Sequence, residues 1–372
     1  MSNIETVFLA SLSQESTFRT GYSLAASLYH APRACALVRG SAAHKGITIF
    51  LRGELGAGKT TFVQGLGLGL GVKAPIVSPT YALENRYGEE LLHMDLFRID
   101  AKEAKRLLEA SEDFPGIRAV EWSERAEGEQ LSSSEEPRAK HRDDELRSDF
   151  SIRAASQCSL EESSIIISFS DPSPTTRNIS LTFADLPLPD LRTIEEWRNE
   201  VKLPDHIRKH CDAVGGFAKQ CAEILLQRGT IARPHALEVA GKLHDLLRFV
   251  DFLNEEDRRI HPEWIALRKK YPFPHEEACA QFVKERGYPE LGEIIRPHGL
   301  PTIDRPEAFQ TIEQKLLFYA DKRVMGDRVV SLEERFKDFV ARYGKGVESE
   351  KAKQWRIKTE ALEKELFGEN VP

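Results

Sequence analysis

Long apolar runs, paired cysteines and an excess of basic residues are all missing from this sequence of 372 residues. No apolar run approaches the ~18 residues of a membrane-spanning helix, so we expect no such span. The five cysteines are scattered and form no C-x-x-C pair, which predicts free thiols in a reducing compartment. A net charge of −7 excludes a global basic field that would draw the protein onto nucleic acid.

The start of the sequence also lacks a targeting pattern. Residues 1–20 contain no basic segment followed by an apolar run, so we expect no signal peptide and a cytoplasmic location. What is present suits globular domains, since 41% of the residues are hydrophobic and 30% are charged. A chain of this length is typical of two or three domains.

Residues 1–185 are predicted to form an α/β domain with a mostly parallel sheet, because strand-like and helical segments alternate there. Residues 47–52, 90–97 and 116–122 contain short apolar runs that are typical of buried strands. An amphipathic helix is expected at 22–30, and another helix is expected to begin after the glycine-rich stretch that follows the first of these strands.

Residues 127–164 are rich in serine, glutamate, aspartate and arginine. Such a segment buries too little apolar surface to offset its ordering entropy, so we expect a mobile acidic insertion. Strand-like runs at 164–170 and 178–183 predict a hairpin that returns to the α/β domain. A proline-punctuated linker is expected at 186–198, and helical periodicity over 199–372 predicts an all-α second domain that ends in charged helices.

The stretch GELGAGKTT, residues 53–61, follows a predicted strand and precedes a predicted helix. It fits the pattern G-x-x-x-x-G-K-[ST], in which backbone N–H groups and a helix N-terminus hold phosphates. Lys59 can reach the β- and γ-phosphates, and the Thr60 hydroxyl can bind Mg²⁺. A chance glycine turn is the alternative interpretation. The predicted nucleotide-binding residues of the loop are Gly53, Glu54, Leu55, Gly56, Ala57, Gly58, Lys59, Thr60 and Thr61.

Two carboxylates follow apolar runs in the same domain. Asp95 ends the segment HMD and Glu121 ends the segment GIRAVE, so both lie at predicted strand ends. The carboxyl ends of parallel strands lie beside the phosphate loop in an α/β sheet, which favours both residues as parts of the nucleotide site. Each is alternatively a residue of a surface turn.

Four motifs in order, GELGAGKTT, VSPTYALENRY, HMDLFRI and AVEWSER, resemble the TsaE family, the P-loop ATPase component of bacterial tRNA threonylcarbamoyladenosine biosynthesis. The upstream STFRTGYSLAASL resembles the first helix of that family, and the match extends over residues 5–185 without the insertion. The resemblance implies ATP with Mg²⁺ as the cofactor. It also implies TsaB- and TsaD-like tRNA-modification proteins as partners, with tRNA contacted indirectly.

The same resemblance implies roles for individual residues. Glu121 would position or activate the attacking water, and Lys59 would complete the catalytic set. Asp95 would hold the metal through the loop threonine or through water, and Thr80 would lie near Mg²⁺. Thr17 would lie near the nucleotide. The implied Mg²⁺ ligands are Thr60, Thr80 and Asp95.

The second half contains histidines and aspartates at intervals of roughly 20–35 residues, a pattern that favours a metal site over isolated structural residues. Imidazole and carboxylate together suit Fe, Mn, Zn or Ni in a site that keeps positions open for water. Metals in such sites activate water and stabilise leaving oxygens. The predicted metal-ligating residues are His210, His244, Asp245, His275, His298 and Asp321.

This set resembles the HD-domain phosphohydrolases over residues 200–335, and is similar to the YqeK-like kind with extra histidines and a dinuclear centre. The resemblance implies one or two divalent metals, with Asp245 as the bridging and catalytic residue. His210, His244 and Asp321 would be the other core ligands, and His275 and His298 would complete a second metal. The sequence HDLLR stands where such domains often read HDIGK. Leu247 is therefore expected to narrow the pocket and Arg248 to contact a phosphate.

The whole sequence is interpreted as a bifunctional protein, in which a TsaE-like ATPase precedes a metal-dependent hydrolase of a nucleotide-type phosphoester. One alternative is a kinase–phosphoesterase that acts on nucleic-acid ends or on a small phosphorylated metabolite, because a phosphate loop can also transfer phosphate to a hydroxyl. A second alternative is that the HD half is a non-catalytic regulatory module.

Overall fold

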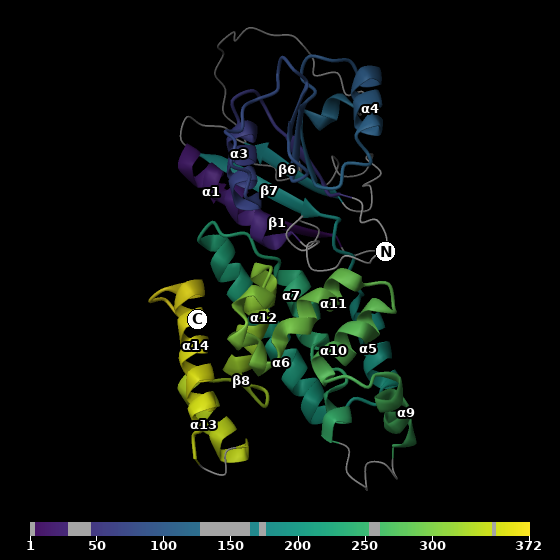
Figure 1. The fold of residues 1–372 in the computed structure, drawn as a ribbon, viewed down its shortest axis with the longest axis vertical. Coiled ribbons are helices and arrows are strands. Elements are labelled where there is room, and N and C mark those ends of the chain that lie inside the picture. The colour runs from purple at the N-terminus through teal and green to yellow at the C-terminus, as the bar shows by residue number, and fades with distance from the viewer. Residues whose placement is uncertain (1–3, 29–45, 127–163, 171–175, 253–260, 344–346) are drawn as a thin grey trace, which may run out of the picture.

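The computed structural model describes residues 4–28, 46–126, 164–170, 176–252, 261–343 and 347–372. An α/β domain lies at one end of the molecule and a helical domain at the other (Figure 1). The predicted insertion at 127–164 lies outside the described residues, apart from its last residue. Among the helices of the described ranges, none has the length and apolar character needed to cross a membrane.

A sheet with the strand order β1-β7-β6-β2-β5-β4-β3 forms the centre of the α/β domain. The central strands β6, β2, β5 and β4 run parallel, and the strands at both edges pair antiparallel. The predicted hairpin is confirmed, because β6 pairs with β7 and also joins β2. The strands are β1 (Glu5–Ser11), β2 (Thr48–Arg52), β3 (Glu84–Tyr87), β4 (Leu91–Asp95), β5 (Ile117–Glu121), β6 (Ser164–Ser170) and β7 (Arg177–Phe183).

Helices cover both faces of this sheet (Figure 1). The helices α1 (Gln14–Leu24) and α3 (Lys59–Leu70) share one apolar core with the sheet, and α4 (Ala101–Ala110) shares another. Helix α1 begins earlier than the helix predicted at 22–30, because Ser13 and Ser16 form a capping box at its start. In the described residues α1 is followed by the short 3-10 helix η1 (Ala25–Ser27).

The helical domain begins inside the range predicted as a linker. Helix α5 (Leu191–Glu200) overlaps the linker predicted at 186–198, so the connection between the domains is shorter than that range. The reason is local, because the Asp190 carboxylate accepts a hydrogen bond from the Thr193 N–H at 2.8 Å and caps the helix. Leu186 and Leu188 are buried in the core of the helical domain, so the connection between the domains is packed against protein.

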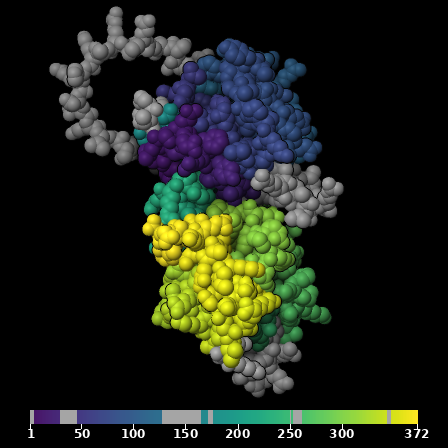
Figure 2. Space-filling view, turned by 60° about the vertical axis from the view of Figure 1, so that its left-hand side comes forward, coloured from purple at the N-terminus to yellow at the C-terminus, as the bar shows by residue number. Residues whose placement is uncertain are grey.

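Helices that follow α5 surround a single apolar core. The described chain departs from the all-α expectation only in a two-stranded ribbon of β8 (Val324–Met325) and β9 (Arg328–Val329). The last two helices lie on the outside of the domain and form part of its surface (Figure 2). The α-helices are α6 (Asp205–Gln227), α7 (Pro234–Leu243), α9 (Pro262–Lys270), α10 (His275–Lys284), α11 (Pro289–Ile295), α12 (Ile312–Arg323), α13 (Leu332–Tyr343) and α14 (Glu350–Phe367).

A buried polar cluster joins the two domains. Arg233 precedes α7 and is fully buried, and its guanidinium donates to both carboxylate oxygens of Asp185 at 3.0 and 2.9 Å. It also donates to the Ser27 carbonyl at 2.7 Å, while the Ser27 hydroxyl donates to Glu313 of α12 at 2.6 Å. These contacts hold the start of α7 and helix α12 against η1, which follows α1.

Candidate functional site

The phosphate loop connects β2 to α3, as its motif predicts. Gly53, Gly56 and Gly58 have φ angles of 139°, 81° and 104°, which glycine adopts without the steric penalty of a Cβ atom. Since Gly58 directly precedes α3, the free N–H groups at the start of that helix belong to the loop. Thr17 of α1 is buried beside it, and a Cβ atom at Gly58 would lie 3.3 Å from the Thr17 methyl carbon.

Lys59 is folded back onto this loop. Its ammonium donates to the carbonyl oxygens of Gly53 at 2.7 Å and Glu54 at 2.9 Å, and lies 3.6 Å from the centre of the Trp122 ring. Burial lowers the pKa of Lys59, and the nearby Glu121 opposes that effect. Trp122 has a φ of 64°, which is a strained conformation for a bulky residue and is typical of functional sites. The loop therefore contains a cation with few water contacts.

The acidic residues of the loop region form two hydrogen-bonded pairs. The Thr60 hydroxyl donates to Glu121 at 2.8 Å, and the Thr80 hydroxyl donates to Asp95 at 2.6 Å. Thr60 thus contacts Glu121 rather than Asp95, its implied partner. The missed residue is His93, which is fully buried with Nε2 at 2.9 Å from the Glu121 oxygen that Thr60 also contacts. Neighbouring parallel strands bring these groups together, since Asp95 and Glu121 are register partners.

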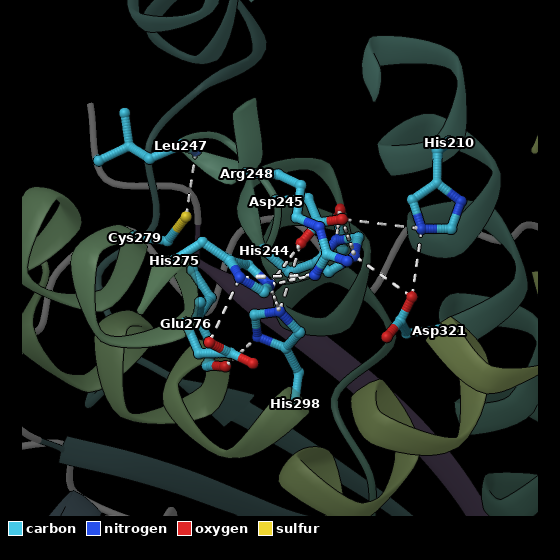
Figure 3. A network of polar contacts seen from close by, with 12 residues as sticks. His210, His244, Asp245, Leu247, Arg248, His275, Glu276, Cys279, His298 and Asp321 are labelled. Carbon is cyan, nitrogen blue, oxygen red and sulfur yellow. Dashed lines mark hydrogen bonds and ion pairs between the residues drawn. The ribbon is translucent and has the colours of Figure 1, made fainter. Parts of the chain in front are cut away.

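The six predicted metal-ligating side chains come together inside the helical domain, although they come from separate segments of it (Figure 3). All except His210 are buried. We call this group the His–Asp cluster. Its members are His210 on α6, His244 and Asp245 directly after α7, His275 at the start of α10, His298 at the end of the 3-10 helix η4 (Arg296–His298), and Asp321 on α12.

The four histidines of the cluster are oriented in the same way. Each has Nδ1 within hydrogen-bond distance of an acceptor oxygen, which turns Nε2 toward the Asp245 and Asp321 carboxylates. Anchored imidazoles of this kind are typical of metal ligands. The acceptors are the carbonyl oxygens of Gly326 for His210 (2.9 Å), Gly241 for His244 (2.7 Å) and Ile295 for His298 (2.7 Å), and the Asp251 carboxylate for His275 (2.8 Å).

The Asp245 carboxylate faces two groups of histidines with its two oxygens. Oδ2 lies 3.7 Å from Nε2 of His244 and 4.0 Å from Nε2 of His210. Oδ1 lies 3.2 Å from Nε2 of His275 and 3.4 Å from Nε2 of His298. A carboxylate in this position can link two sets of ligands.

The described residues contain two groups of three possible metal ligands. Within each group, the ligand atoms all lie within 4.8 Å of one another. The groups are His210, His244 and Asp321, and His244, Asp245 and His298. Within the described part of the chain, His244 Nε2 and Asp245 Oδ1 are buried without a hydrogen-bond partner. Burial opposes ionisation of Asp245, but the neighbouring imidazoles hold its pKa well below the usual range. An ionised carboxylate beside an unpartnered imidazole nitrogen fits a divalent transition metal.

Leu247 and Arg248 take different positions next to the cluster. Leu247 was expected to narrow the pocket, but this expectation is wrong, because its side chain is fully buried in the apolar core and does not line the cavity (Figure 3). Its N–H group donates to the Cys279 sulfur at 3.2 Å. Arg248 does line the cavity, and its Nη1 lies 2.7 Å from Nε2 of His275. A positive charge thus lies beside the cluster.

Comparisons with known proteins concern the first half of the chain. The family described as "Threonylcarbamoyl adenosine biosynthesis protein TsaE" matches residues 14–149. A relative from Nostoc sp., named tRNA threonylcarbamoyladenosine biosynthesis protein TsaE, is 52% identical over 88 residues, which are 22% of this chain and 54% of the relative. The protein of the same name from Treponema pallidum is 40% identical over 96 residues, covering 25% of this chain and 71% of the relative.

The chain spans about half the length of the first curated relatives that it matches, 54% and 56% respectively. Among solved structures, the crystal structure of Bacillus subtilis YdiB aligns with 50% of this chain and 89% of its own, at 20% identity and a TM-score of 0.31. That score is too low to support a structural argument, so the similarity to known proteins rests on the sequence comparisons.

Proposed function

Because the chain belongs to the TsaE family through its N-terminal domain, we propose that this domain binds and hydrolyses Mg-ATP in support of tRNA threonylcarbamoyladenosine biosynthesis. The observation that carries the proposal is the contact between Thr60 and Glu121 at the phosphate loop. A hydroxyl that can hold Mg²⁺ and a carboxylate that can orient water lie there within 2.8 Å of each other. TsaB- and TsaD-like proteins are the proposed partners, and tRNA is contacted through them.

Each residue of the loop has a proposed task. Lys59 leaves its two carbonyl partners and binds the β- and γ-phosphates, which exchanges neutral acceptors for charged ones. Thr60, with Asp95 and Thr80 nearby, supplies oxygen ligands for Mg²⁺. Glu121 then orients the attacking water, and its own position is fixed by His93 on the neighbouring strand.

ATP hydrolysis by the full chain tests this half of the proposal. We expect slow hydrolysis by the protein alone, stimulation by the partner proteins, and loss of activity in Lys59→Ala. The matched control is Lys73→Ala, because Lys73 is an exposed lysine beyond the end of α3. ATP hydrolysis that persists in Lys59→Ala would contradict the assignment, and labelled phosphate on an acceptor other than water would favour the kinase alternative.

For the helical domain, we propose a metal-dependent hydrolase of a nucleotide-type phosphoester. The observation that carries this proposal is the common orientation of four histidines, each held at Nδ1 with Nε2 turned toward Asp245 or Asp321. His210, His244, Asp245 and Asp321 would hold one divalent ion, and His275 and His298 would complete a second with Asp245 shared. Bound divalent ions of this kind activate water and neutralise charge on a phosphoester.

Residues around the cluster have matching tasks. Arg248 would bind a phosphoester oxygen, because its guanidinium lines the cavity beside His275. Lys322 is buried, contacts Asp321 and donates to the His298 carbonyl at 3.0 Å, so it supplies a second positive charge. Asp251 holds the His275 ring at Nδ1, so that Nε2 points toward Asp245.

Hydrolysis of a panel of phosphoesters, after addition of Mn²⁺ or Fe²⁺, tests the second half. We expect activity in the full chain and its loss in Asp245→Asn. Asp205→Asn is the matched control, since Asp205 is an exposed carboxylate on α6, the helix that carries His210. No activity and no bound metal would favour the non-catalytic regulatory alternative.

A further inference from the structure

The cavity above the His–Asp cluster extends well beyond the cluster itself. It has a volume of about 390 Å³, within the range of roughly 300–1,000 Å³ that is typical of small-molecule sites. Asp245 and His298 line one part of it, and the C-terminal helices α13 and α14 line another. Those two helices follow the segment that provides the cluster, and they form an outer part of the helical domain (Figure 2).

Aromatic rings dominate the part of the cavity that α13 and α14 provide. Phe336 and Phe339 of α13 line it and pack edge to face with ring centres 5.6 Å apart. Trp355 of α14 lines it as well, and its indole N–H donates to Asp304 at 2.8 Å. Lys358 holds that carboxylate in turn, at 2.5 Å. The Trp355 ring is therefore anchored at its polar edge, and the Lys351 ammonium lies 4.8 Å from the centre of the ring.

Arg335 places a cation against these rings. Its guanidinium carbon lies 4.1 Å from the centre of the Phe339 ring, and its Nη1 donates to Asp338 at 3.0 Å. Only 12% of the side chain is exposed, and its Nε has no hydrogen-bond partner among the described residues. A buried donor without a partner is rare in folded proteins, so a ligand that accepts from it has a physical role here.

We propose that this wall, defined by Arg335, Phe336, Phe339 and Trp355, binds the nucleobase of a nucleotide whose phosphoester lies at the His–Asp cluster. Aromatic rings suit any base, because each base offers a flat π-face for stacking. The Arg335 Nε–H donates to an acceptor on the base edge, while Arg248 and Lys322 face the phosphate. This inference rests on the proposed hydrolase function and adds the part of the molecule that selects the substrate.

Two variants separate base recognition from phosphate chemistry. In Phe339→Leu and Arg335→Gln we expect KM for adenosine and guanosine 5′-monophosphate to rise roughly tenfold, because the first variant loses a stacking ring and the second loses a hydrogen-bond donor to the base edge. KM for glycerol phosphate, which has no base, stays at the wild-type value. Arg342→Gln is the matched control, because Arg342 lies on the same helix, is exposed and does not line the cavity. Equal effects on both substrates, or none on either, would overturn the proposal.

A binding measurement keeps the test independent of catalysis. Calorimetric titration of adenosine 5′-monophosphate into Asp245→Asn, with and without Arg335→Gln, reports the wall alone. We expect binding in Asp245→Asn that weakens about tenfold when Arg335→Gln is added. If no phosphoester is hydrolysed but this difference remains, the hydrolase function fails and the base site stands. If the nucleotide does not bind, or binds both proteins equally, the base site is wrong.

Discussion

The buried carboxylate of Glu5 makes stability depend on pH at the junction between the domains. Glu5 starts β1 and accepts hydrogen bonds from the backbone N–H groups of His235 at 2.6 Å and Ala236 at 3.3 Å, in the first turn of α7. Burial raises the pKa of Glu5 from 4.5 to about 7. Since a change of one in pKa corresponds to ~1.4 kcal/mol, the ionised carboxylate costs the folded state about 3 kcal/mol.

Between pH 4.5 and 7 the unfolded chain has released the Glu5 proton, whereas the folded chain keeps it. The folded state binds more protons there, so this contribution to stability is present below pH 4.5 and is lost as pH rises through 7. The variant Glu5→Gln has no such titration and keeps an oxygen that can accept from the His235 N–H. We expect the two proteins to be equally stable at low pH, and the variant to be more stable by about 3 kcal/mol at pH 8.

Urea unfolding followed by circular dichroism at several pH values from 4 to 8 measures this difference. Other titrating groups act equally on both proteins, so the comparison isolates Glu5. Glu223→Gln is the control, because Glu223 is an exposed carboxylate on α6 at the same junction. A stability gap between Glu5→Gln and wild type that stays constant with pH would refute the reasoning.

Three further outcomes follow from named contacts. In Arg233→Met the buried Asp185 loses its partner, so we expect a loss of about 3–5 kcal/mol in urea unfolding, part of which returns in the double variant with Asp185→Leu. In Gly21→Ala the new methyl group would lie 2.0 Å from the Phe62 carbonyl oxygen. We therefore expect α1 and α3 to separate, the free energy of unfolding to fall by about 1–3 kcal/mol, and the Tm to fall with it. In His93→Gln the position of Glu121 is less fixed, so we expect kcat for ATP hydrolysis to fall by up to about 100-fold while ATP affinity stays near wild type. Unchanged stability in Arg233→Met, an unchanged Tm in Gly21→Ala or an unchanged kcat in His93→Gln would contradict the corresponding expectation.

Local signals explain which parts of the fold could be predicted. The phosphate loop could be predicted because its glycines and Lys59 all lie within the nine residues 53–61. Strands β2 and β5 could be predicted because each is a short apolar run. The apolar pattern at 22–30 does not mark the start of α1, which the capping residues Ser13 and Ser16 indicate and which lies close to the resemblance at 16–28. The linker range 186–198 is too long for the same kind of reason, since Asp190 is also a cap.

Contacts between distant segments could not be predicted from the sequence. His93 reaches Glu121 only because β4 and β5 are parallel neighbours with a particular register. The pair of Arg233 and Asp185 depends on how the two domains meet. For the His–Asp cluster, residue type and spacing indicated the six members, but the carbonyl oxygens that orient the histidines belong to the tertiary structure.

Metal content is the most direct test of the claim that the chain combines a phosphate loop with a metal-dependent site. Elemental analysis of the full chain, purified without chelators and then reconstituted with Mn²⁺ or Fe²⁺, gives the number of ions bound per chain. We expect one or two ions in the wild type and in Asp205→Asn, and a clear loss in Asp245→Asn, in which the carboxylate proposed to bridge the ions is neutralised. A wild-type chain that binds no divalent ion, or an ion content that Asp245→Asn leaves unchanged, would contradict the account.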